Sequence, residues 1–211
     1  MGEWLAQHWI DIAGFATGAA CVFLSWRRSV WNFPIGIANS ALFLVVTFQA
    51  ALFATAGLQV VFIVLSLLGW LDWARARAAE RQAGAARDEA FVRRTPRRAI
   101  LPLARVGVAL TAVITWLLAT YTPSVIPLPD AAVVAGSLIA QFMLNRRWIQ
   151  TWYVWIAVDV AYVAIYAATG LWLFAVLYLG FIAMCVAGLA SWRRAERDAA
   201  SAADEPEPAY A

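Results

Sequence analysis

The sequence predicts an all-α integral membrane protein, with seven transmembrane helices in two parallel three-helix repeats joined by a single helix. Three observations support this prediction: the composition, the distribution of arginine and an internal similarity at a fixed spacing. Of the 211 residues, 64% are hydrophobic and only 14% are charged. Soluble domains are about 25% charged, so this composition indicates a chain that lies mostly within a bilayer.

Apolar stretches recur along the chain, each about long enough as a helix to cross a hydrocarbon core of about 30 Å. They lie at about 9–25, 32–49, 52–73, 100–121, 130–145, 149–168 and 171–191. The first stretch has no basic leader of the kind that precedes a signal peptide, so we expect it to be retained as a helix. Cys21 and Cys185 fall inside predicted helices and are expected to be apolar packing residues without a disulfide.

The basic residues are all arginine. With seven crossings they all fall on one side of the membrane, in the first, third and fifth loops, the start of the fourth helix and the C-terminal tail. The opposite side carries Glu3, Asp11 and Asp130. Because arginine in short loops is retained in the cytoplasm, we expect an external N-terminus and a cytoplasmic C-terminus. This topology accounts for the basic pI of about 9.2 without a nucleic-acid partner, and contact with anionic membrane lipid is the alternative role.

The two ends of the chain match at an offset of 119 residues. Apolar residues are expected to match often by chance in such a hydrophobic sequence, but arginine, glycine and tryptophan also recur at this offset. The pairs include Arg27 with Arg146, Arg28 with Arg147, Gly69 with Gly188 and Trp73 with Trp192. The offset spans four helices, an even number, so both copies should cross the membrane in the same direction.

The repeat divides the chain into five parts. We expect a first three-helix repeat at 1–73, a connecting helix at 100–121 and a second repeat at 130–192. Residues 74–99, with mixed charge and abundant alanine, are expected to form a cytoplasmic linker whose main role is connection. The acidic, proline-containing tail at 193–211 is expected to be disordered.

The sixth predicted helix carries a polar and aromatic stripe within "TWYVWIAVDV" and the residues that follow. Trp152, Trp155, Asp159, Tyr162 and Tyr166 follow alternating steps of three and four, which places them on one helix face. Asp159 lies about 15 Å deep, where a carboxylate costs roughly 2.5–3.5 kcal/mol and usually faces a cavity or a partner. The stripe therefore predicts a binding cavity. The alternative is an interfacial tryptophan belt with Asp159 paired inside the bundle.

Other polar residues at depth are candidates for the same cavity. They are Asn39, Gln59 and, at the position equivalent to Gln59 in the second repeat, Tyr178. Each could instead form a hydrogen bond between helices. Together with the tryptophans they would suit a flat ring that carries hydroxyl groups, because indoles stack on rings and amides bind polar groups.

The sequence contains few of the residue combinations that enzyme active sites need. Metal and haem sites need clustered histidine, cysteine or carboxylate ligands, and the single histidine is His8, near the external end. No serine or cysteine is paired with a histidine at depth. We therefore expect neither catalysis nor a cofactor.

The segments "VWNFPIGIAN", "LFATAGLQVVFIVLSLLGWLDW" and "WYVWIAVDVAYVAIYAATGLWLFAVLY" together resemble the PnuC family of bacterial vitamin transporters. The resemblance implies a SWEET-like fold in the bacterial plasma membrane, often a homotrimer. It also implies facilitated diffusion of nicotinamide riboside, which a cytoplasmic kinase then traps by phosphorylation.

In that family a Trp-x-x-Trp-x-x-x-Asn element on the sixth helix and a glutamine on the third line the substrate site. Here these positions are Trp152, Trp155, Asp159 and Gln59. Aspartate in place of asparagine leaves the substrate open among nicotinamide riboside, thiamine, riboflavin and deoxynucleosides. A non-transporting membrane scaffold and ion-coupled uptake are further alternatives, and the lack of a second deep acidic residue favours uncoupled transport.

Overall fold

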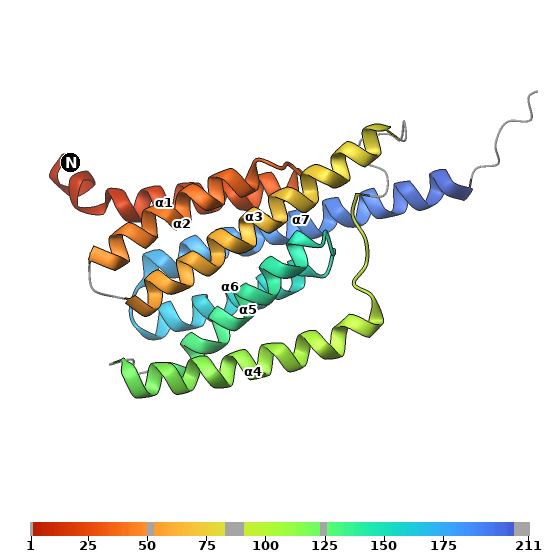
Figure 1. The fold of residues 1–211 in the computed structure, drawn as a ribbon. Helices are drawn as coiled ribbons and strands as arrows, with labels where there is room; N and C mark the ends of the chain where they lie inside the picture. The colour runs from red at the N-terminus through yellow and green to blue at the C-terminus, as the bar shows by residue number, and fades with distance from the viewer. Residues whose placement is uncertain (1, 50–52, 83–90, 123–125, 205–211) are drawn as a thin grey trace, which may run out of the picture.

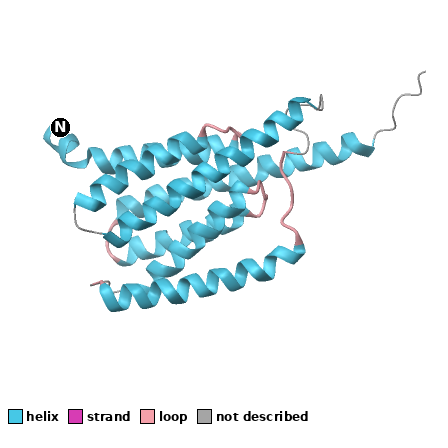
Figure 2. Ribbon diagram, viewed as in Figure 1, coloured by secondary structure: helices cyan, strands magenta, loops and turns pink. Residues whose placement is uncertain are grey.

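The computed structural model describes residues 2–49, 53–82, 91–122 and 126–204. This part of the chain forms seven α-helices, shown in Figures 1 and 2. They are α1 (Gly2–Trp26), α2 (Asn32–Gln49), α3 (Phe53–Gln82), α4 (Arg97–Tyr121), α5 (Pro127–Asn145), α6 (Thr151–Ala168) and α7 (Trp172–Asp204). Helices α2 to α7 are each long and apolar enough to cross a membrane, and α1 contributes the shorter apolar helix Ile12–Trp26. The predicted all-helical membrane fold is confirmed.

Two helices extend well beyond their predicted ends. Helix α3 continues to Gln82 and α7 to Asp204, and Figure 1 shows the end of α7 projecting from the bundle. The added turns are rich in alanine, arginine and glutamate, which favour helix even in water. The expectation of disorder is therefore wrong for 193–204, while 205–211 lies outside the described residues.

The last part of the predicted linker belongs to the core of the protein. Phe91 is only 1% exposed and packs edge-on against Trp73, with 4.9 Å between ring centroids. The Arg93 N–H donates to the Arg147 carbonyl at 3.0 Å, and the Ile149 N–H donates to the Arg93 carbonyl at 3.0 Å. These hydrogen bonds attach the segment to the turn between α5 and α6. It therefore has a structural role in addition to the connection that we expected. Residues 83–90 of the linker lie outside the described part.

The helices pack in a pattern that repeats between two halves of the bundle. Helix α1 packs on α2 and α7, and α5 correspondingly packs on α6 and α3. Exchanging α1 with α5, α2 with α6 and α3 with α7 leaves this set of neighbours unchanged. Among the described helices, α4 packs only on α5, and Figure 1 shows it along the outer edge of the bundle. This is the arrangement predicted for a connecting helix.

Equivalent tryptophans make exchanged hydrogen bonds across the two halves. The Trp73 indole donates to the Leu144 carbonyl at 3.1 Å, and the Trp192 indole donates to the Ser25 carbonyl at 3.1 Å. The offset of 119 residues relates the donors, and it also relates the acceptors. These bonds bring the C-terminal ends of α1, α3, α5 and α7 to one end of the bundle, so the repeats are parallel.

The arginine-containing turns gather at this same end. Arg28 and Arg147, equivalent in the repeat, adopt φ of 54° and 59°, a left-handed conformation that few non-glycine residues take. Arg77 donates to the Arg28 carbonyl at 2.9 Å, and Arg147 donates to the Asp72 carbonyl at 3.3 Å. We call this region the arginine end of the protein.

Two equivalent glycines let large aromatic side chains pack directly on helix backbone. A Cβ atom at Gly69 would lie 2.4 Å from Phe33 Cε1, and one at Gly188 would lie 2.6 Å from Trp152 Cη2. Phe33 and Trp152 are themselves equivalent in the repeat and almost fully buried. The same contact between a buried aromatic ring and a helix glycine therefore occurs in both halves.

Gly188→Ala is expected to lower the free energy of unfolding by about 1–3 kcal/mol, because the buried Trp152 ring would have to leave its position. The matched control is Gly180→Ala on the same helix, where nothing lies within 4 Å of the added Cβ. Alanine should be neutral there or stabilising by up to about 1 kcal/mol. SDS titration of the purified protein in mixed micelles measures both. Equal stability of the two variants would contradict the close packing at Gly188.

Candidate functional site

A cavity of about 590 Å³ lies between the two repeats. Helices α1, α2, α3, α5, α6 and α7 line it, whereas α4 contributes no residue. The structure brings all the candidate residues from the sequence to this one cavity: Asn39, Gln59, Trp152, Trp155, Asp159, Tyr162, Tyr166 and Tyr178.

Asp159 supplies the charge in this cavity. Of the described residues that line the cavity, it alone has a charged side chain, and it is only 6% exposed. Its Oδ2 accepts a hydrogen bond from the Cys185 thiol, with 3.6 Å between sulfur and oxygen. A thiol is a weak donor, so most of the capacity of the carboxylate to accept hydrogen bonds remains for a ligand.

Several polar positions in this cavity were missing from the sequence prediction, and three of them are related to Asp159 by contact or by the repeat. Cys185 was expected to serve packing alone, but it donates to Asp159. Ser40 and Ser66 also line the cavity, and they are the residues equivalent to Asp159 and Cys185 at the offset of 119. Applying the repeat to Asp159 would have found Ser40. At these equivalent positions each half thus supplies a pair of small polar side chains, and only the pair of the second half includes a charged group.

Asn39 and Gln59 reach the cavity in different ways. The Asn39 side-chain oxygen accepts a hydrogen bond from the Thr17 hydroxyl at 3.0 Å, which ties α2 to α1 as the alternative interpretation expected. Gln59 is partly buried and lines the cavity from α3. Asn39 therefore makes a hydrogen bond between two helices and also lines the cavity.

The two tryptophans of the stripe occupy different environments. Trp152 is 1% exposed and lies edge-on to Trp192 at 5.4 Å, so it does not belong to an interfacial belt. Its indole nitrogen is buried and has no hydrogen-bond partner among the described residues. Trp155 is only partly buried, and its equivalent in the first repeat is Gly36, which lines the same cavity. Trp155 thus presents a ring surface to the cavity, whereas the equivalent position in the first repeat has no side chain.

The tyrosines form an aromatic cluster in the part of the cavity remote from the arginine end. The Tyr162 and Tyr178 ring centroids lie 4.7 Å apart, and those of Tyr166 and Tyr178 lie 5.4 Å apart. Sequence reasoning chose Tyr178 as the equivalent of Gln59, and the structure places it beside the other two tyrosines. Phenylalanines that the sequence analysis did not single out complete the cluster: Phe15, Phe174 and Phe181.

The arrangement is suited to binding rather than to catalysis. Its walls combine ring surfaces, amides, hydroxyls and one carboxylate, which together can hold a flat ring and an attached polar group. In the described part of the chain, no group of three histidine, cysteine, aspartate or glutamate residues is placed to hold a metal ion.

The chain is similar to known transporters. Residues 8–194 match the family model described as nicotinamide mononucleotide transporter. The riboflavin/roseoflavin transporter RibM of Streptomyces davaonensis is 30% identical, over 91% of this chain and 89% of that protein. The nicotinamide riboside transporter PnuC of Escherichia coli is 24% identical, over 92% and 89%.

The fold is also shared with a solved structure. The crystal structure of the vitamin B3 transporter PnuC matches with a TM-score of 0.70 and 19% identity, covering 92% of this chain and 85% of that chain. The transporter families matched here are not enzyme families, in agreement with the expectation from the sequence. The chain belongs to the nicotinamide mononucleotide transporter family, the PnuC family of multi-pass membrane vitamin transporters.

Proposed function

We propose that this protein transports nicotinamide riboside across the bacterial plasma membrane through the cavity between its repeats. The observation that carries the proposal is the Asp159 carboxylate in a cavity that also presents the Trp155 ring. A positively charged pyridinium ring is attracted both to an indole face and to a carboxylate. Gln59 and Asn39 would bind the ribose hydroxyls or the carboxamide, and the tyrosine cluster would enclose the ring.

Riboflavin is the second candidate substrate. The supporting observation is the 30% identity to RibM, which is named as a riboflavin/roseoflavin transporter. The isoalloxazine ring carries no positive charge, so Asp159 would serve it only by accepting hydrogen bonds from the ribityl hydroxyls. The two candidates therefore differ in what they require of the Asp159 charge.

Ligand titration of the purified protein in detergent tests the proposal. Nicotinamide riboside, thiamine, riboflavin and deoxynucleosides are compared by calorimetry. Micromolar affinity for nicotinamide riboside and much weaker binding of the others is the expected result. Micromolar binding of riboflavin alone would overturn the first candidate in favour of the second, and no binding of any compound to folded protein would contradict both.

Asp159→Asn is expected to reduce the preference for a cationic ligand about tenfold, through loss of one charge interaction of about 1.4 kcal/mol. Asparagine keeps the shape and an acceptor oxygen, so the fold should persist. The measurement is the affinity for nicotinamide riboside divided by that for its reduced, uncharged dihydro form. An unchanged ratio would show that the carboxylate does not select for charge.

We further infer uncoupled transport, because no second acidic residue lines the described cavity to complete a cation site. Retention of arginine in the cytoplasm orients the arginine end inward and the N-terminus outward. Cytoplasmic phosphorylation would then trap the substrate, and a homotrimer is the expected assembly. Uptake into proteoliposomes that is independent of proton and sodium gradients supports the uncoupled mechanism, and gradient-driven accumulation contradicts it.

A further inference from the structure

A second cavity, separate from the central site, lies beside the connecting helix α4. It has a volume of about 860 Å³ and is a groove between α4 and α6, with α5 as its floor. Among the described helices α4 packs only on α5, so the groove is not closed by direct packing of α4 on α6. No residue that lines this groove also lines the central cavity. We call it the α4 groove.

The α4 groove is apolar along most of its length. Its apolar lining includes Ile100, Leu103, Ala104 and Val108 of α4 and Ala132 and Ile139 of α5. The Thr111 hydroxyl also lines the groove, but it donates to the Gly107 carbonyl of its own helix at 2.9 Å. From Ile100 to Ala112 the groove follows α4 for about 18 Å, at 1.5 Å per residue. This length is similar to one leaflet of a hydrocarbon core of about 30 Å.

The other polar side chains of the α4 groove lie at the arginine end. The Thr95 N–H and hydroxyl both donate to Gln150 Oε1, at 2.7 and 2.9 Å, and the Gln150 amide nitrogen has no hydrogen-bond partner among the described residues. The Tyr153 hydroxyl accepts a hydrogen bond from Arg193 of α7, whose guanidinium carbon lies 5.4 Å from the centre of the Tyr153 ring. The groove therefore has donors and a positive charge at one end only.

Arg97 adds a second positive charge at this end, from the first turn of α4. It precedes Ile100 by three residues and Ala104 by seven, a spacing that places all three on one helix face. Arg98 is turned about 100° further around the helix, away from that face. Both arginines are exposed, and neither forms an ion pair with a described residue. Arg97 is therefore the arginine of α4 that lies on the groove side.

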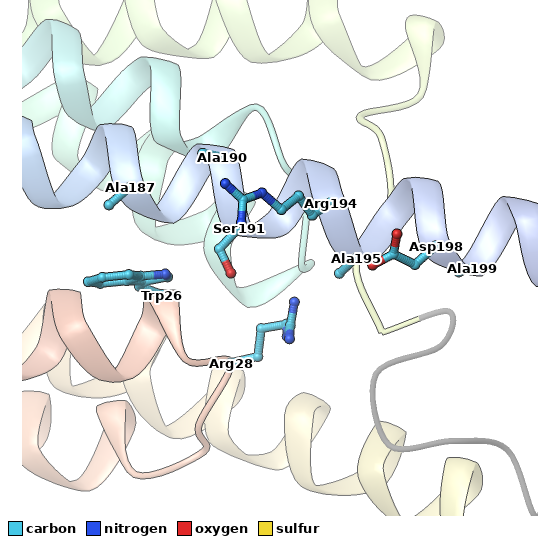
Figure 3. Close-up of a pocket in the computed structure, with 9 residues that line it drawn as sticks. All are labelled: Trp26, Arg28, Ala187, Ala190, Ser191, Arg194, Ala195, Asp198 and Ala199. Atoms are coloured by element: carbon cyan, nitrogen blue, oxygen red, sulfur yellow. The ribbon is translucent and has the colours of Figure 1, made fainter.

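The neighbouring arginine of α7 belongs to a different cavity. Figure 3 shows Arg194 with Trp26 and Ser191 in a cavity of about 440 Å³ between the end of α1 and the side of α7. This cavity shares no lining residue with the α4 groove. Of the two adjacent arginines, Arg193 is thus the one in contact with a residue of the α4 groove.

We propose that the α4 groove binds an anionic membrane phospholipid, with an acyl chain along α4 and α5 and the phosphate at the arginine end. Arg97 and Arg193 bind the phosphate oxygens, for which their planar donors are well suited, and the Gln150 amide donates to the same headgroup. The charge distribution favours a lipid over a second copy of this chain, because an apolar helix in the groove would bury the guanidinium groups without a negative partner. The lipid fills the space between α4 and α6.

Native mass spectrometry of the full chain, titrated with phosphatidylglycerol or phosphatidylcholine, tests the headgroup end of the site. Phosphatidylglycerol should bind more tightly, and equal affinity for the two lipids would contradict the proposal. Arg97→Gln is expected to weaken phosphatidylglycerol binding about fivefold, equivalent to about 1 kcal/mol for one basic residue near a lipid surface. The matched control is Arg98→Gln, which should leave binding within about twofold of the wild type. Equal losses in both variants would show a diffuse charge effect and overturn the site.

A second pair of variants tests the acyl-chain end without changing a charge. Ala104→Phe fills the groove and should weaken binding of both lipids about tenfold. The matched control is Ala109→Phe, because Ala109 is also exposed on α4 but does not line the groove. Unaltered lipid binding by folded Ala104→Phe would contradict the proposal, and loss of oligomers in the same spectra would then identify the groove as a contact between copies. The arginine comparison still tests the site if Ala104→Phe fails to fold.

Discussion

Trp155→Ala is expected to weaken binding of nicotinamide riboside about 30-fold, or about 2 kcal/mol, because it removes both ring stacking and the attraction of a cation to the indole face. The position equivalent to Trp155 is Gly36, so the opposite repeat has no side chain that could replace the lost ring surface. Calorimetric titration of the purified variant measures the effect. Trp155→Phe should recover part of the affinity, since a phenyl ring still stacks but attracts a cation less strongly.

The control for this experiment is Trp116→Ala. Trp116 is 59% exposed on α4, the helix that contributes nothing to the cavity, so its loss should leave ligand affinity unchanged. The thermal unfolding midpoint of each variant, recorded without ligand, separates a binding defect from a folding defect. Full affinity in a folded Trp155→Ala protein would remove the sixth helix from the proposed substrate site.

Phe91→Ala is expected to lower the free energy of unfolding by about 3–5 kcal/mol, the usual range for truncating a fully buried phenylalanine. The Phe91 ring packs against Trp73 and lies 3.7 Å under the Arg77 guanidinium carbon. Its removal would leave a void beside a buried arginine. Unfolding in SDS mixed micelles measures the loss, with Val108→Ala, at a 72% exposed position, as the control.

This result would assign a structural role to a segment that looks like a linker. If Phe91→Ala and Val108→Ala are equally stable, the 91–95 segment does not anchor the turn between α5 and α6. A large loss would show that the connection after α3 stabilises the core around Trp73 at the arginine end.

The repeat explains how one cavity can have two chemically different walls. Ser40 and Ser66 stand where the other half has Asp159 and Cys185. A substrate between the two walls would therefore meet hydroxyls on one side and a carboxylate on the other. Because different side chains occupy equivalent backbone positions, the two walls of the cavity differ in charge while the two repeats keep the same helix packing.

The membrane fold and most of the site could be predicted because they depend on short-range periodicity. Steps of three and four place Trp152, Trp155 and Asp159 on one helix face wherever that helix lies. The ends of α3 and α7 were less predictable, because hydropathy marks the depth of the bilayer and not the end of a helix. Phe91 gave no signal either, since a single aromatic residue in a polar segment has no period.

The sequence by itself determined the seven apolar segments, their common arginine end, the duplication at an offset of 119 residues and the polar stripe on the sixth helix. Each of these follows from local hydrophobicity, charge or spacing. Only the tertiary structure decided that Cys185 donates a hydrogen bond to Asp159, that Trp152 belongs to the core and that the Arg147 guanidinium lies beside the Asp72 carboxylate. These features depend on contacts between helices far apart in the chain, and the geometry of helix packing sets them.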